Sequence, residues 1–185
     1  GQLEVPIVFR GPNASAKQVG SQHSHAVEPM YTNVPGLIVV YPSTPRDAKG
    51  LLKTAIRDNN PVIFLEGETL YSHKGPVGGP DEVIPFGQGK IIREGHDCTV
   101  VVWGRPVGEV LKVADLLKER GIEIEVIDPR TLRPLDEQMI FDSVRKTHRC
   151  VVVHEHWPYG GPGAEIVSRV QSAVFDDLDA PVLRA

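Results

Sequence analysis

Short apolar runs alternate with amphipathic stretches along most of the chain. The runs are rich in β-branched residues, which predicts short buried strands. Between the runs, apolar residues recur at helical spacing, as they do after Thr44-Pro45, where a capping threonine and a first-turn proline predict a helix start. The predicted strands are residues 6–9, 37–41, 62–65, 98–103, 122–127, 150–154 and 181–183.

The order of these elements predicts the fold class. Strand, helix and strand in succession indicate parallel crossover units, because a crossover helix returns the chain to the same edge of the sheet. The first half predicts one such unit, with its helix ending before Asn59-Asn60-Pro61. The second half repeats the pattern several times. The sequence therefore predicts an α/β protein with two open, mainly parallel sheets.

A change in composition separates the two halves. Residues 71–85 are dense in Gly and Pro and show no periodicity, which is typical of a linker. We therefore expect three parts, which are residues 1–70, a linker of residues 71–88, and residues 89–185.

Composition narrows the class of partner. The 185 residues are 41% hydrophobic and carry a formal net charge of -4, so a sizeable core is expected and a nucleic-acid partner is not. No apolar run approaches the length of a membrane span, and no signal peptide is visible in a chain that begins with Gly. Cys98 and Cys150 each open an apolar run, which favours buried thiols in a reducing compartment over the alternative of a disulfide.

A polar segment that contains Gln22-His23-Ser24 follows the first predicted strand. The cluster Arg10-Gly11-Pro12-Asn13 predicts that the chain turns directly after this strand. Ligands of α/β proteins bind beyond the carboxyl ends of strands, where a histidine is suited to transfer a proton near neutral pH. The alternative is a solvent-facing loop histidine, and the residues alone leave both interpretations of His23 open.

The helix that begins after Thr44 ends in a second candidate site. Its last carbonyls have no partners within the helix and carry the negative end of the dipole, and Asp58 adds a carboxylate at the same end. A bound cation would suit this all-oxygen set. The alternative is simple solvation, with Arg57 or a neighbouring lysine offsetting the charge.

Four patterns in the second half resemble sites. Gly104-Arg105-Pro106 and the glycines of residues 160–163 lack the dinucleotide and phosphate-loop fingerprints, so tight turns are expected there. His154-Glu155-His156 has the spacing of a metal pair on one strand face, but no third ligand is apparent, which favours packed or interface histidines. The charged residues of 128–136 are expected to form ion pairs within a loop.

Residues 5–13, Gln22-His23-Ser24 and residues 55–62 together closely resemble the β subunit of the E1 component of 2-oxoacid dehydrogenase complexes, and the pyruvate dehydrogenase branch most nearly. The resemblance covers essentially the whole chain. It implies part of a pyrimidine-type transketolase domain followed by an incomplete transketolase C-terminal domain, each a three-layer αβα structure. It also implies oxidative decarboxylation of pyruvate and transfer of the acetyl unit to a lipoyl group.

The resemblance implies a catalytic role for His23 and a bound potassium ion. Thiamine diphosphate with Mg²⁺ is implied at the interface with an E1 α subunit. The residues that contact this cofactor are expected on that subunit or in a segment that precedes this chain, so the chain alone is expected to be inactive. The residues implied to bind potassium are Ile7, Ala55 and Ile56, through their backbone carbonyls, together with Asp58 and Asn60.

The implied partners are the E1 α subunit, a second β subunit, the E2 lipoyl acetyltransferase and pyruvate, in a bacterial cytoplasm or a mitochondrial matrix. Neither nucleic acid nor a membrane is expected. The alternatives are a branched-chain 2-oxoacid or acetoin dehydrogenase E1 β subunit, a transketolase-like sugar reaction, or a non-catalytic module that binds an α subunit. Ala14 stands where relatives often have Gly, and His25 where they often have Gln, which is expected to stiffen the loop and alter its polarity.

Overall fold

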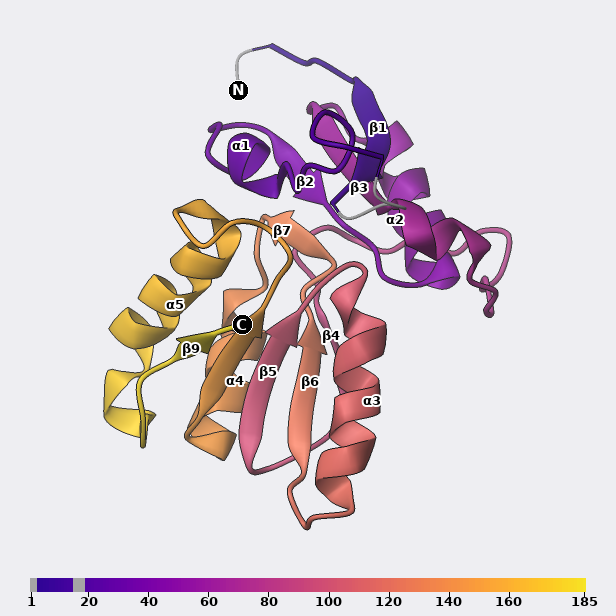
Figure 1. Ribbon diagram of the computed structural model, residues 1–185. Coiled ribbons are helices and arrows are strands. Elements are labelled where there is room, and N and C mark those ends of the chain that lie inside the picture. Colours follow the sequence, from indigo (N-terminus) through magenta and orange to yellow (C-terminus); the bar gives the residue numbers. More distant parts are fainter. Residues whose placement is uncertain (1–2, 15–18) are drawn as a thin grey trace.

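The computed structural model describes residues 3–14 and 19–185, and their strands form two sheets (Figure 1). In the view of Figure 1, the sheet of the first half lies above the sheet of the second half. Most strand pairs in both sheets are parallel, so the predicted α/β class is confirmed. Within the described ranges, every helix is too short or too polar to traverse a bilayer.

The first sheet is built around the predicted crossover unit. Its strand order is β1-β3-β2-β7, and β3 pairs in parallel with both β1 and β2. Helix α2 packs Leu51 and Ala55 against this sheet. Its predicted start is confirmed, because the hydroxyl of Thr44 accepts a hydrogen bond from the amide of Asp47 at 3.1 Å. The elements of this half are β1 (Val8–Asn13), α1 (Glu28–Thr32), β2 (Ile38–Val40), α2 (Pro45–Arg57), β3 (Val62–Gly67) and the 3₁₀ turn η1 (Glu68–Ser72).

The second sheet has helices on both faces, as the three-layer expectation requires. Its strand order is β4-β6-β5-β8-β9, and β4 is an antiparallel edge strand that the sequence pattern does not predict. Helix α3 packs Val107 and Val110 on one face, whereas α4 and α5 pack Ile140 and Ile166 on the other. The elements are β4 (Lys90–Arg93), β5 (Cys98–Val102), α3 (Pro106–Lys118), β6 (Ile124–Asp128), β7 (Thr131–Arg133), α4 (Glu137–Thr147), β8 (Cys150–Val153), α5 (Gly161–Ala173), η2 (Phe175–Asp177) and β9 (Leu183–Arg184).

Strand β7 joins the two halves. It belongs to the second half of the chain but pairs antiparallel with β2 of the first sheet, within residues 128–136 that were expected to form a loop. One hydrophobic cluster accordingly includes Ile63 of the first sheet, Leu132 of β7 and Val101 of the second sheet. The loop expectation is wrong because the strand is formed by pairing with a distant segment rather than by local pattern.

The connection between η1 and β4 contains no helix or strand, as expected for the Gly- and Pro-rich stretch. It is packed along α2, since Ile84 is buried against Gly50 and the Lys49 amine donates to the carbonyl of Gly79 at 2.9 Å. The division into residues 1–70, 71–88 and 89–185 stays a prediction, because β7 of the third part completes the sheet of the first.

The first strand differs from its prediction in position and in burial. The pattern predicts a buried strand at residues 6–9 and a turn at 10–13, whereas β1 begins at Val8 and continues through Asn13. Parallel pairing with β3 along its whole length carries the chain through the expected turn. Pro12 is tolerated because β1 is an edge strand, where a missing N–H is not needed. The same edge position leaves the strand largely exposed.

Candidate functional site

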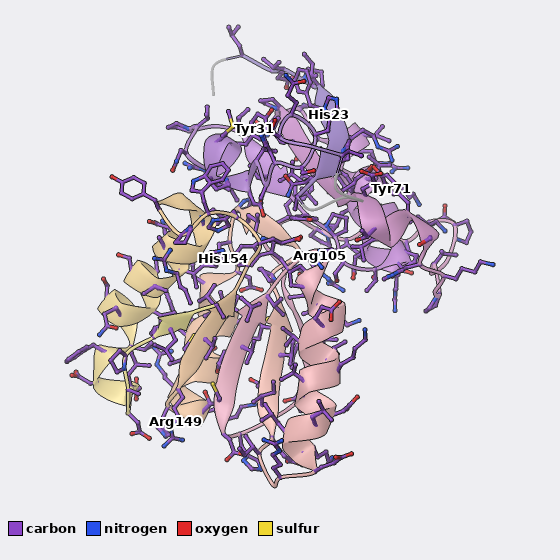
Figure 2. All side chains as sticks on the ribbon, viewed as in Figure 1. His23, Tyr31, Tyr71, Arg105, Arg149 and His154 are labelled. Atoms are coloured by element: carbon purple, nitrogen blue, oxygen red, sulfur yellow. The ribbon has the colours of Figure 1, made fainter. Side chains whose placement is uncertain are left out.

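His23 lies on a turn beyond the carboxyl end of β1. The backbone amide of His23 donates to the carbonyl of Gly20 at 3.3 Å, and its side chain is exposed. Figure 2 shows His23 beside the first sheet, away from His154 at the junction of the two sheets. The polar segment that precedes this turn includes residues 15–18, which lie outside the described residues. The exposed ring fits both interpretations of His23, so its catalytic role stays a prediction.

Three hydrogen bonds tie the end of β1 to the start of α1, across the connection that carries His23. The amide of Ala14 donates to the carbonyl of His25 at 2.8 Å, and the amide of Val27 donates to Oδ1 of Asn13 at 2.8 Å. Nδ2 of Asn13 donates in turn to Oε2 of Glu28 at 2.9 Å. The side chains of Asn13 and Glu28 are buried, so these bonds are shielded from water.

Ala14 adopts a left-handed backbone conformation with a φ of 64°. Residues other than glycine adopt this conformation at a cost of roughly 1–2 kcal/mol. Glycine adopts it freely, which gives a physical reason for the glycine expected at this position in relatives. Nothing in the structure explains the histidine at position 25.

The backbone brings together the two segments that contain the predicted potassium ligands. The amide of Val62 donates to the carbonyl of Ile7 at 2.9 Å, and the amide of Val5 donates to the carbonyl of Asn59 at 2.9 Å. These bonds join the segment before β1 to the turn between α2 and β3. Ile7 therefore lies at the amino end of the paired strands β1 and β3, close to the turn that follows α2.

Asp58 forms the carboxyl-terminal cap of α2. Its amide donates to the carbonyl of Ala55 at 3.3 Å, and its Oδ1 accepts bonds from the backbone and side-chain amides of Asn60, both at 2.8 Å. The guanidinium of Arg57 donates to the carbonyl of Lys53 at 2.9 Å. Arg57 is thus directed along the helix rather than toward Asp58. Carbonyl and carboxylate oxygens gather at this helix end, but the potassium site stays a prediction.

A partly buried polar cluster lies where β2, β5 and β8 end. The Tyr41 hydroxyl donates to Oε1 of Glu155 at 3.1 Å, and Nε of Arg105 donates to Oε2 at 2.6 Å. Burial raises the pKa of Glu155 and the pKa of Tyr41. Gly104 has a φ of 64°, and a Cβ there would lie 2.5 Å from Cζ of Tyr41. The space above this glycine is filled by an aromatic ring, which agrees with the tight turn expected there.

Of the charged residues of 128–136, Asp128, Arg130 and Arg133 contact the first half of the chain, whereas Asp136 accepts bonds from the amides of Gly89 and Met139. Arg130 forms an ion pair with Asp47 at 2.8 Å, and the hydroxyl of Ser43 donates to Asp128. Burial raises the pKa of Asp128 to about 6. These contacts hold the segment around β7 against the start of α2. An ion pair is therefore present as expected, but its partner belongs to the first half of the chain instead of the same loop.

The rings of His154 and His156 are packed, which agrees with the expectation of packed or interface histidines. Their ring centroids are 3.7 Å apart, and each lies 6.1 Å from the ring of Trp103. Nε2 of His156 accepts a bond from the amide of Gly163 at 3.3 Å. Burial lowers the pKa of both rings, that of His154 to about 4. Across the described ranges, no group of three His, Cys, Asp or Glu side chains is placed to hold a metal ion.

The two cysteines are free thiols on opposite faces of the second sheet. Cys150 packs in the cluster beneath α4 and α5, whereas Cys98 packs in the cluster beneath α3. Side chains on opposite faces point apart, so a disulfide between them is excluded without rearrangement of the strands.

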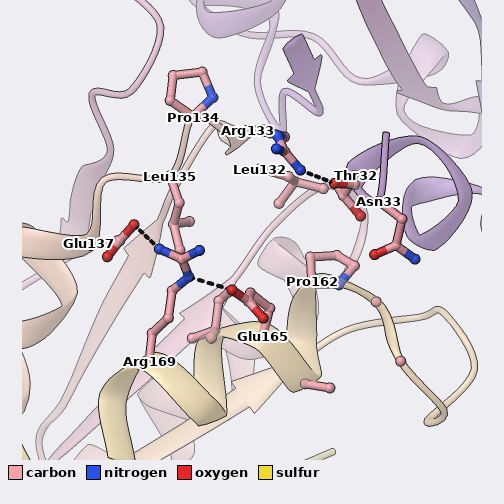
Figure 3. A pocket seen from close by; sticks show the side chains of 14 residues that line it. Thr32, Asn33, Leu132, Arg133, Pro134, Leu135, Glu137, Pro162, Glu165 and Arg169 are labelled. Carbon is pink, nitrogen blue, oxygen red and sulfur yellow. Dashed lines mark hydrogen bonds and ion pairs between the residues drawn. The ribbon is translucent and has the colours of Figure 1, made fainter. Parts of the chain in front are cut away.

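Two pockets lie outside the His23 turn. The larger, of about 630 Å³, lies between α1, β7 and the start of α5 (Figure 3). Its charged groups bind one another or the backbone: Arg169 pairs with Glu137 and Glu165, and Arg133 donates to a carbonyl of α1. The smaller, of about 230 Å³, has Arg10 in its wall. His23 lines neither pocket, so neither supplies a chemical role for it.

Sequence reasoning missed three groups that the structure places together. Asn13 was interpreted only as a turn residue, and Glu28 and Glu155 received no role of their own. A weak signal exists for Glu28, which interrupts the mainly apolar stretch Ala26 to Met30. Burial of that carboxylate depends on the second half of the chain, which no local pattern reports.

Comparison with known proteins identifies the family. The family model for the transketolase C-terminal domain matches residues 87–185, and the model for the transketolase pyrimidine binding domain matches residues 1–74. A solved structure titled as a split gene transketolase, inactive beta4 tetramer, has a TM-score of 0.82 at 24% identity and covers 98% of this chain and 57% of that chain. This likeness supports the fold.

Closer relatives are E1 β subunits. The chain is 51% identical over 182 residues to the pyruvate dehydrogenase E1 component subunit beta of Rickettsia felis, which covers 98% of this chain and 56% of that relative. It is 50% identical over 189 residues to the mitochondrial subunit beta of Caenorhabditis elegans, which covers 100% of this chain and 54% of that relative. The chain thus spans about half the length of the curated relatives it matches. The resemblance predicted from the sequence is confirmed, and the chain belongs to the transketolase family, with its pyrimidine-binding and C-terminal domains.

Proposed function

We propose that this chain is the β-subunit portion of a thiamine diphosphate-dependent pyruvate dehydrogenase E1, which decarboxylates pyruvate and transfers the acetyl unit to the lipoyl group of an E2 acetyltransferase. The identity of about half of all positions with E1 β subunits over nearly the whole chain supports this. The observation that carries the proposal is this identity, and the exposed position of His23 on a turn that follows β1 is consistent with it.

The proposed role of His23 is to transfer a proton. Thiamine diphosphate, held with Mg²⁺ mainly by an E1 α subunit, supplies the electron sink for decarboxylation. His23 reaches this site from the β-subunit side and gives a proton to the substrate oxygen or stabilises the dihydrolipoyl product. Its exposure, and its absence from both pockets, are consistent with a site that another subunit completes.

Replacement of His23 tests this role in the assembled enzyme. In the complete β subunit combined with its α subunit and a lipoyl acceptor, His23→Ala should lower acetyl transfer about 100-fold. Its free energy of unfolding should change by less than about 0.5 kcal/mol, because the residue is exposed. His73→Ala, which removes another exposed histidine, is the matched control and should leave transfer unchanged. Transfer near the original rate in His23→Ala would contradict the proposal.

The same assembly also tests the substrate and the partners. Higher turnover of branched-chain 2-oxoacids, of acetoin or of a sugar than of pyruvate would assign a different branch of the family. Association with an α subunit without any turnover would indicate a non-catalytic binding module. We propose an assembly that contains a second β subunit. We place this assembly in a bacterial cytoplasm or a mitochondrial matrix, because the relatives include a bacterial and a mitochondrial protein.

We also propose that a potassium ion supports the amino end of β1, the strand that leads into the connection that carries His23. Its ligands would be the carbonyls of Ile7, Ala55 and Ile56, with oxygens of Asp58 and Asn60. The adjacency of Ile7 to the end of α2 and the cap formed by Asp58 support this set. The side chain of Ile56 is aliphatic, so this residue offers only its carbonyl. The ion would tie the segment before β1 to α2 and take no part in proton transfer.

Exchange of monovalent cations tests this site. When sodium is replaced by potassium at about ten times its dissociation constant, the Tm should rise by about 4 °C, because the ion binds only the folded state. Asp58→Ala should abolish this rise. Asp81→Ala, at an exposed position of the connection before β4, is the matched control and should retain it. A Tm that responds equally to potassium in both variants would remove Asp58 from the ligand set.

A further inference from the structure

Glu28 is a buried carboxyl group that the proposed chemistry does not use. It is the first residue of α1, and its side chain is 0% exposed. Its Oε2 accepts a bond from Nδ2 of Asn13 at 2.9 Å. Burial raises the pKa of the Glu28 carboxyl, and the amide of Asn13 and the indole of Trp103 oppose that rise. A carboxyl group removed from water in this way is costly, which calls for a specific role.

Glu28 reaches the His23 connection through Asn13. The side-chain amide of Asn13 is engaged at both ends, because Nδ2 donates to Glu28 and Oδ1 accepts the amide of Val27 at 2.8 Å. Its orientation is therefore fixed. The next residue, Ala14, donates its amide to the carbonyl of His25 at 2.8 Å and closes the base of the connection. Loss of the Glu28 carboxyl would free one end of the Asn13 amide.

The second half of the chain covers Glu28. Trp103, which follows β5, is buried, and its indole is close enough to the Glu28 carboxyl to lower the pKa of that group. A Cβ on Gly161 at the start of α5 would lie 2.9 Å from Cγ of Pro29, so α5 is packed closely against α1. Figure 1 shows α1 directly above one end of α5. The base of the His23 connection is thus fixed by groups from both halves.

We propose that Glu28 is a positioning residue for His23. Its carboxyl group orients Asn13, and Asn13 holds together the two ends of the connection that carries the imidazole. This inference rests on the proposed function, because its catalytic consequence requires His23 to act in the reaction. Glu28 itself contacts no reacting atom.

Hydrogen exchange tests the arrangement without any measurement of activity. In the assembled protein, Glu28→Ala should speed exchange at the amides of Ala14 and Val27 about tenfold, because both bonds lose their buried support. Glu28→Gln should stay within about threefold of the original rates, since its amide oxygen still accepts from Asn13. Glu125→Ala is the matched control, because Glu125 is also fully buried but lies on β6 of the second sheet. It should leave exchange at both amides unchanged.

Kinetics separate positioning from a purely structural role. In the complex with the α subunit and a lipoyl acceptor, Glu28→Ala should lower kcat about tenfold and leave KM for pyruvate within about twofold, because a small displacement of a catalytic group lowers the rate of the chemical step. Glu28→Gln should restore kcat. A purely structural residue would instead reduce the fraction of folded enzyme and leave kcat per folded site unchanged.

Two results would overturn this inference. The first is exchange at Ala14 and Val27 that is unchanged in Glu28→Ala or equally raised in Glu125→Ala. The second is an unchanged kcat in Glu28→Ala when His23→Ala abolishes transfer. If His23→Ala keeps full activity while exchange in Glu28→Ala rises as expected, the proposed function fails and the support of the connection by Glu28 stands.

Discussion

His23 is exposed on a turn beyond an edge strand, whereas His154 and His156 are stacked beside Trp103 beneath the start of α5. Burial lowers the pKa of both stacked rings, so they are neutral near pH 7. Nδ1 of His154 is hydrogen-bonded to the carbonyl of His156, and Nδ1 of His156 is hydrogen-bonded to the carbonyl of Trp157. The two regions place the same side chain in different surroundings, because the ring of His23 is exposed to solvent and the two stacked rings are packed.

This comparison shows that the spacing of histidines in the sequence does not by itself tell whether their rings are exposed or packed. His154-Glu155-His156 has the closer likeness to a metal motif, yet its rings are used for packing and its Glu155 binds Arg105. The single histidine of a polar turn has a weaker sequence signal. Its ring is nevertheless exposed, whereas the stacked rings are packed.

If the region of the stacked histidines serves to stabilise the fold, a change that disturbs its packing should lower the free energy of unfolding more than the other substitutions considered below. Gly104→Ala would place a methyl group 2.5 Å from the ring of Tyr41, on a backbone with a φ of 64°. We expect the free energy of unfolding to fall by about 3 kcal/mol from the clash and the backbone strain together. Urea denaturation near neutral pH measures this change.

Gly108→Ala is the matched control for this substitution. Gly108 is exposed in α3, and nothing lies within 4 Å of the added Cβ. The higher helix propensity of alanine predicts a gain of about 0.5–1 kcal/mol. If Gly104→Ala costs less than about 1 kcal/mol, the junction repacks readily and the contrast between the two regions is weaker than described.

A smaller effect distinguishes the buried rings by their pH dependence. The pKa of His154 is about 4 in the folded state against an ordinary value of 6.5, so between these values the unfolded chain binds more protons. The stability contributed by neutral His154 is therefore present above pH 6.5 and is lost as the pH falls toward 4. Because the ring is only half-buried, we expect a loss of about 1 kcal/mol rather than the full linkage value.

Urea denaturation at about pH 7 and about pH 5 measures this loss. His154→Gln should lose about 1 kcal/mol less over the interval than the unsubstituted protein, because glutamine does not titrate. His23→Gln, at an exposed position, should lose as much as the unsubstituted protein. Equal losses in all three proteins would show that burial of His154 is not linked to stability.

The sequence predicts those elements whose burial is set by their neighbours along the chain. Helix α2 is an example, since its cap at Thr44 and its apolar face are both local. Strands β1 and β7 were misjudged because pairing with distant strands decides whether residues 10–13 and 131–133 extend or turn. Gly11, Pro12 and Asn13 have turn propensity, and only the edge position beside β3 overrides it.

The candidate site divides in the same way. His23 and Asp58 could be singled out because their chemistry is visible in single residues and in the resemblance to a family. The role of Glu28 could not be predicted from the sequence. Its burial depends on Trp103, and its hydrogen bond depends on Asn13. The stacking of His154 on His156 also requires the close approach of Gly163, which sequence spacing does not report.

Strand β7 links the two halves of the chain, because it follows β6 of the second sheet and pairs with β2 of the first. A break of the chain in the connection before β4 would remove β7 and leave the edge of β2 without a partner. Unpaired strand edges promote self-association, so the first half expressed alone would be prone to aggregate. Reassembly from two separate polypeptides therefore requires the second half to cover that edge, as in fragment complementation.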